Sequence, residues 1–186
     1  ILSSCKRGRW PLLFSKCGAG VMFAWILTIL FTLSNLLVFG LLCGFEGWSS
    51  PLYAIESYQY TPFSGSILLF YGLMSGMKAI GFSVTALLLI FLSACFQKSL
   101  YPCLIGLGLG AALNYCAGWA LSSVWWKQAL SCISPFTLTS GSKLLESLSG
   151  VSIGGVYLIW VFVALIVQVV IACLLVIAIR RKSCCK

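Results

Sequence analysis

Long stretches without a charged side chain are the feature that most limits how this chain can fold. A helix that crosses about 30 Å of hydrocarbon needs about 20 apolar residues. Four uncharged stretches approach or exceed this length, at 17–45, 79–97, 99–126 and 147–179. Only 8% of the 186 residues are charged, too few to cover a water-facing surface. The sequence therefore predicts an all-α fold, a polytopic transmembrane helical bundle.

Trimming the polar ends of these stretches gives about four spanning helices. We expect them near 18–43, 79–97, 102–124 and 153–179. They belong to a single transmembrane domain, 18–186, which ends in a basic tail at 180–186. A basic amphipathic flank, 1–17, precedes this domain. The first residue is Ile1 rather than Met, which favours a fragment or a processed product.

The predicted outer loop, 44–78, contains a further uncharged stretch that is too short to span. Its part before Ile67 is rich in Pro, Gly and Ser. The apolar remainder measures about 16 Å as a helix, half a membrane. Joined to the helix at 79–97 it would reach about 45 Å, too long without strong tilt. We therefore expect a short re-entrant or interfacial helix at 66–77. The expected break lies near Gly72, Gly76 or Gly81.

The basic residues set the expected orientation. Nine of the 12 Lys and Arg fall on one side of a four-span topology, and all three carboxylates fall on the other. Basic residues concentrate on the cytoplasmic side of membrane proteins. We therefore expect a multi-pass protein of the cytoplasmic membrane with both termini in the cytoplasm. Aromatic residues at the predicted outer boundary agree with this orientation: Trp48, Tyr53, Tyr58, Tyr60, Trp125 and Trp126.

Composition also excludes classes of function. The chain has no His and only three Asp and Glu, so it lacks the usual groups of metal sites and of acid–base catalysis. We expect no enzyme activity, no metal and no cofactor in this chain. Its net charge of +9 is dispersed among long uncharged runs, which argues against nucleic acid as a partner. The partner that the sequence does require is the lipid bilayer.

Two charged regions are open to a functional or a structural interpretation. Apolar residues recur at helical spacing between basic residues in the flank, from Lys6 to Cys17. This pattern fits a short cytoplasmic helix that binds a partner, or a plain positive-inside anchor. Lys78, near the outer end of a predicted span, fits a functional site or a side chain that extends to the outer headgroups. Glu46 and Glu56 fit either an entrance for substrate or solvated loop positions.

Polar residues within the predicted spans also allow two interpretations. They could line a transport pathway, or they could bond to a neighbouring helix or to the backbone one turn back. The residues concerned are Asn35, Ser83, Thr85, Ser93, Asn114 and Gln168.

The order of several short patterns resembles the membrane subunit of ATP-binding-cassette exporters of the ABC type-2 permease family. The first pattern is Gly8-Arg9-Trp-Pro-Leu-Leu-Phe-Ser-Lys16, before a span. Ser57-Tyr-Gln-Tyr-Thr-Pro62-Phe, Ser66-Ile67 and Lys78 are similar to the outer loop of such permeases, and Leu92-Ser-Ala-Cys-Phe-Gln-Lys98 to their next span. Ser134-Pro135-Phe136 and the final Arg180-Arg181-Lys182 also fit. Such permeases usually have six spans, so the resemblance implies that the first two are missing here.

The resemblance implies a permease subunit that exports an amphiphilic compound, such as a peptide, an antibiotic or a lipid-like molecule. It implies two partners, a separate cytoplasmic ATPase subunit that binds the ATP, and a second permease subunit in a homo- or heterodimer. The candidate ATPase-facing surface comprises Arg7, Arg9, Trp10, Leu13, Phe14 and Lys16. The candidate outer gate comprises Glu46, Glu56 and Lys78. The alternative is a non-transporting four-helix membrane protein, such as an immunity, scaffold or assembly factor.

Overall fold

Four membrane-length helices dominate the computed structural model. The structure describes residues 9–44, 47–58, 65–96, 100–121, 125–139, 150–153 and 156–184. Within these ranges, four helices are long and apolar enough to cross a membrane. They are α1 (Arg9–Cys43), α2 (Ile67–Cys95), α3 (Leu100–Ala117) and α7 (Trp160–Cys184). The predicted helical class is confirmed, and the chain is a multi-pass membrane protein.

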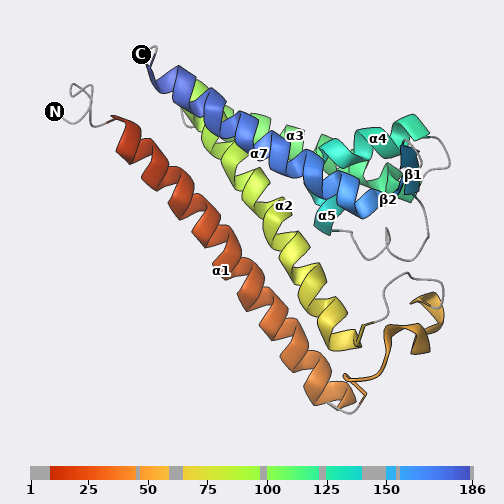
Figure 1. Ribbon diagram of the computed structural model, residues 1–186. Coiled ribbons are helices and arrows are strands. Elements are labelled where there is room, and N and C mark those ends of the chain that lie inside the picture. Colours follow the sequence, from red (N-terminus) through yellow and green to blue (C-terminus); the bar gives the residue numbers. More distant parts are fainter. Residues whose placement is uncertain are drawn as a thin grey trace.

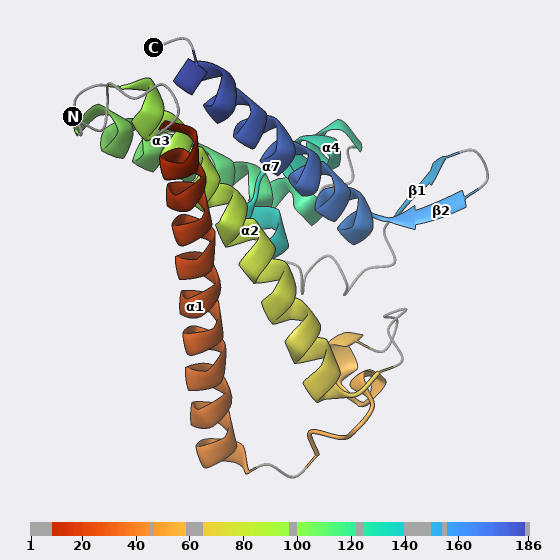
Figure 2. The same cartoon turned by 60° about the vertical axis from the view of Figure 1, so that its left-hand side comes forward.

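Shorter elements connect the long helices. They are the 3₁₀ turns η1 (Leu52–Ala54), η2 (Glu56–Tyr58) and η3 (Gly118–Leu121), the helices α4 (Trp125–Ile133) and α5 (Phe136–Thr139), and the strands β1 (Gly150–Ile153) and β2 (Val156–Ile159). The strands pair antiparallel, with Val151 opposite Leu158, and project away from the start of α7 (Figure 2). The last spanning helix therefore begins at Trp160 and not near 153 as predicted, because the preceding residues pair as a hairpin.

The second helix differs most from the prediction. Ser66 caps it: the Ser66 side-chain oxygen accepts a hydrogen bond from the Leu69 N–H at 3.4 Å. From there α2 runs unbroken for 29 residues to Cys95. The predicted break, and with it a separate helix at 66–77, is wrong. Interrupting a helix in lipid leaves backbone groups without partners, which costs more than the weak helix propensity of glycine.

The ends of the first and third helices also differ from the predicted ends. α1 begins at Arg9, so the described part of the basic flank forms the first turns of the spanning helix and not a separate one. It ends at Cys43, followed by Gly44 with φ +78°, a left-handed conformation that suits glycine after a helix. α3 ends at Ala117, seven residues before the predicted end at 124.

α2 lies at the centre of the bundle and packs against α1, α3, α5 and α7. α1 and α2 extend beyond the other helices at the end that carries η1 and η2, while the start of α1 and the end of α7 lie toward the opposite end (Figure 1).

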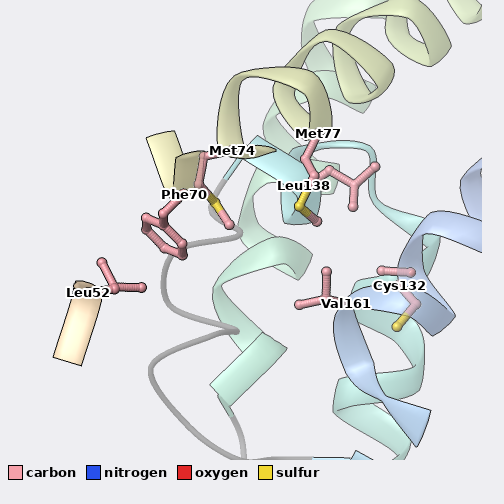
Figure 3. Packing of buried hydrophobic residues seen from close by; sticks show 8 residues of the cluster. Leu52, Phe70, Met74, Met77, Cys132, Leu138 and Val161 are labelled. Carbon is pink, nitrogen blue, oxygen red and sulfur yellow. The ribbon is translucent and has the colours of Figure 1, made fainter. Parts of the chain in front are cut away.

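The core forms where the N-terminal half of α2 meets the connecting elements. Met77 of α2 lies beside Leu138 of α5, with Val161 of α7 and Cys132 of α4 next to them (Figure 3). Most of α1, by contrast, is uncovered: Leu41 and Leu42 are 78% and 79% exposed. Such apolar exposure along a whole helix is stable in lipid and not in water.

Candidate functional site

A groove between α1 and α2 is the candidate functional site. It has a volume of about 610 Å³, within the range of small-molecule sites, and it is open along one side. Two contacts fix the register of α1 against α2, the helices that form its walls. The Tyr71 hydroxyl donates to the Thr32 carbonyl oxygen at 3.3 Å, and a Cβ added to Gly20 would lie 2.8 Å from Ile90 Cδ1. On α1 the lining runs from Gly20 to Asn35, about 22 Å along the helix.

Lys78 is the one charged residue among the described residues that line this groove. It is the twelfth residue of α2, about 16 Å from the first residue of that helix, because α2 does not break before it. Its side chain is half-buried. Within the described ranges, no carboxylate pairs with its ammonium and no side chain accepts a hydrogen bond from it.

The other residues of the predicted outer gate do not join Lys78. Glu56 is exposed in η2, and the described structure holds no ion pair between Glu56 and Lys78. Glu46 lies outside the described residues. The predicted gate therefore reduces to Lys78 as far as the structure describes it.

The predicted ATPase-facing residues that the structure describes lie at the opposite end of α1. Phe14 and Lys16 are exposed in its early turns. Arg9, Trp10 and Leu13 belong to the helix, but their side chains, like all of Arg7, lie outside the described part. Phe14 and Cys17 also face a smaller apolar hollow shared with Val176 and Ile179 near the end of α7.

A second feature, which the sequence did not reveal, is the turn between α4 and α5. The Gln168 side-chain amide on α7 donates to the last carbonyls of α4, to Cys132 O at 2.9 Å and to Ile133 O at 3.0 Å. Gln168 is completely buried. It lies seven residues into the span that begins at Val161, about 10 Å from that end. The α4–α5 turn therefore packs beside the interior of a spanning helix, as a re-entrant segment does.

Buried hydroxyls complete the hydrogen bonds of this turn. Ser134 Oγ donates to the Leu113 carbonyl of α3 at 2.7 Å and accepts from the Phe136 N–H at 3.3 Å. The hydroxyls of Ser131 and Thr137 donate to carbonyls of α4. Non-helical backbone at membrane depth is tolerated only where protein satisfies it. These residues satisfy the backbone at 125–139, which lies between the predicted spans at 102–124 and 153–179.

The cysteine of this segment is shielded. Cys132 is buried, and desolvation by burial raises the pKa of its thiol to about 11, although the Ser131 hydrogen bond lowers it in part. Because the thiolate is the reactive form, burial and this raised pKa make Cys132 slow to react at neutral pH.

Three of the six polar residues predicted within the spans bond as expected for structural positions. Ser83 and Thr85 donate to carbonyls one turn back, Ala79 O and Gly81 O. Gln168 bonds to a neighbouring element, as described above. Asn35 lines the groove and has no hydrogen-bond partner among the described residues. Of the three residues of this set without such a partner, Asn35 is the one that lines the groove, so the pathway interpretation applies to it and not to Ser93 or Asn114.

No protein-family model, no curated protein and no solved structure matches this chain.

Proposed function

We propose that this chain is the permease subunit of an ATP-driven exporter of the ABC type-2 kind. It would move an amphiphilic compound across the cytoplasmic membrane together with a separate ATPase subunit and a second permease subunit. Both of its termini would lie in the cytoplasm, where nine of its 12 basic residues are then found.

The observation that carries this proposal is the α1–α2 groove. A site for a compound that travels through lipid should be apolar along most of its length and open to the bilayer, with a few polar groups. The groove has these properties, with Phe23, Leu27 and Leu89 on its walls and Lys78 as its charged group. A scaffold that only binds another membrane protein needs no such opening.

The re-entrant α4–α5 segment suggests how the groove could respond to ATP. Thr139, the last residue of α5, lines the groove, and α5 packs against α2 beside Gly81. A shift of the re-entrant segment would therefore change the shape of the groove. An ATPase can drive such a change only if its contacts with the permease differ between two arrangements. The sequence has no phosphate-binding Gly-x-x-x-x-Gly-Lys-Ser/Thr loop of its own, so the energy must come from a partner.

The test is the purification of the full-length protein from its own cells in mild detergent. An ATPase subunit that carries a phosphate-binding loop should co-purify, and the eluate should hydrolyse ATP. The double variant Arg7→Glu with Arg9→Glu should weaken this association about tenfold, because two attractive charges on the proposed surface become repulsive.

The matched control reverses two charges that the topology places on the other side, Lys127→Glu with Lys143→Glu. This variant should retain the ATPase. Normal biological function of the protein in cells that lack any associated ATPase would contradict the proposal, and would favour the non-transporting alternative.

A further inference from the structure

The groove has a polar half and an apolar half. Toward the end that carries η1 and η2, its lining includes Thr32, Asn35, Tyr71, Ser75 and Lys78. Toward the opposite end the lining is almost wholly apolar: Gly20, Phe23, Ala24, Leu27, Ala86 and Leu89. The exceptions there are Thr28 and Thr85, whose hydroxyls donate to the backbone one turn back, to Ala24 O at 2.8 Å and to Gly81 O at 3.0 Å. The groove therefore suits a ligand with a polar head at one end and an apolar chain at the other.

Most hydroxyls in the groove already have partners, which identifies the groups left for a ligand. Thr28 donates to Ala24 O, Tyr71 to Thr32 O and Ser75 to Gly72 O. Within the described part of the chain, the Lys78 ammonium and the Asn35 amide make no hydrogen bond. A half-buried ammonium without a counter-ion at membrane depth is costly. An anion placed beside it would remove that cost.

We infer that the groove selects an amphiphile with one extended alkyl chain and an anionic head, such as a carboxylate, which pairs with Lys78 and accepts a hydrogen bond from Asn35. The chain of the ligand then lies between the apolar halves of α1 and α2. The elongated form of the groove favours an extended chain over a compact ring system. This inference rests on the proposed function in that it names the class of the exported compound.

The binding test uses the full chain in nanodiscs of zwitterionic lipid, without ATPase or ATP. Three photoreactive probes share one diazirine-bearing 16-carbon chain and differ in the head: a carboxylate, a methyl ester and a trimethylammonium. The carboxylate probe should label peptides from the apolar halves of α1 and α2 at least tenfold more than the other two. This comparison requires no variant and so does not depend on the folding of one.

Variants of Lys78 then test whether this residue pairs with the anionic head of the ligand. Lys78→Met should lower labelling by the carboxylate probe about tenfold, since the charge-assisted hydrogen bond is lost. Lys78→Arg, which keeps the charge, should retain labelling within about twofold. Lys127→Met is the matched control, because Lys127 lies over the rings of Trp119 and Trp126 and away from the groove, and it should leave labelling unchanged.

Several outcomes would overturn the inference. Equal labelling by all three probes, or undiminished labelling of Lys78→Met, would show that the head is not selected by charge. Equally strong labelling by a photoreactive phosphatidylglycerol would assign the groove to bilayer lipid. If two copies of the protein cross-link to each other at the groove without any probe, the groove is an interface with a second copy and not a ligand site. The test contains no ATPase, so its result is independent of the exporter proposal. Charge-selective labelling would support the inferred ligand even if no ATPase associates with the protein. Failed labelling would contradict the inferred ligand and not the exporter proposal.

Discussion

Gly81→Val is expected to destabilise the protein by about 3 kcal/mol. A Cβ added to Gly81 would lie 2.6 Å from the Pro135 carbonyl oxygen and 3.5 Å from Leu138 Cβ. The near atom belongs to the backbone of the α4–α5 turn, which Ser134 and Gln168 hold in place through hydrogen bonds. A flexible side chain could rotate away from the added atoms, but this backbone cannot move without breaking those bonds.

The same helix provides a matched control. Gly72 and Gly76 also lie within α2, and an added Cβ at either position would meet nothing within 4 Å. Gly76→Val should therefore change stability by less than about 0.5 kcal/mol. The measurement is reversible unfolding in mixed micelles at increasing mole fractions of dodecyl sulfate, followed by circular dichroism. Equal midpoints for Gly81→Val and Gly76→Val would mean that α2 and the α4–α5 turn do not touch.

These glycines also explain why the second helix was predicted incorrectly. The sequence presents Gly72, Gly76 and Gly81 as equivalent candidates for a break. The structure shows that none of them breaks the helix and that they differ only in their surroundings, since the Pro135 carbonyl approaches one of them closely. Which glycine lies against another element depends on tertiary packing, and no local pattern encodes it.

The existence of the four spans could be predicted because it depends on a local quantity, the length of each apolar run. The re-entrant segment could not, because α4 (Trp125–Ile133) is short and polar enough to resemble a loop. Its place beside α7 requires the buried amide of Gln168. The one available signal was the uncharged run at 128–142, which has Ser134-Pro135 as a helix breaker and lies next to a span that contains a glutamine.

The candidate site was predictable in part for the same reason. Lys78 and Asn35 stand out in the sequence as polar residues among apolar ones. That they line one groove depends on the register of α1 against α2, which is set by the Tyr71 hydrogen bond to Thr32 O and the close approach at Gly20. Glu46 and Glu56 were grouped with Lys78 only because the topology places all three on one side.

Gln168→Leu is the second change from which a large effect is expected. Leucine fills a similar volume but cannot donate, so the carbonyls of Cys132 and Ile133 lose their side-chain partner. Unsatisfied buried acceptors cost about 1–3 kcal/mol each, and hydrogen bonds between membrane helices are worth somewhat less. We expect a combined loss of about 2 kcal/mol, concentrated in the attachment of α4 to α7.

Local opening of this segment can be measured through Cys132. In a variant that keeps Cys132 as its sole cysteine, burial and the raised pKa of the thiol, about 11, make alkylation slow at pH 7. Because 1.4 kcal/mol corresponds to a factor of ten, a loss of 2 kcal/mol in the opening free energy should speed alkylation by a membrane-permeant maleimide about thirtyfold. The rate in both proteins should rise with pH, since the thiolate is the reactive form.

Asn114→Leu is the matched control for this experiment, because it removes an amide of the same kind from an exposed position on α3. It should leave the alkylation rate of Cys132 unchanged. Equal rates in Gln168→Leu and the parent would mean that the buried hydroxyls of Ser134 and Thr137 hold the α4–α5 turn alone. A thirtyfold difference would instead show that the Gln168 amide holds the end of α4 against α7, and with it the turn that leads to α5.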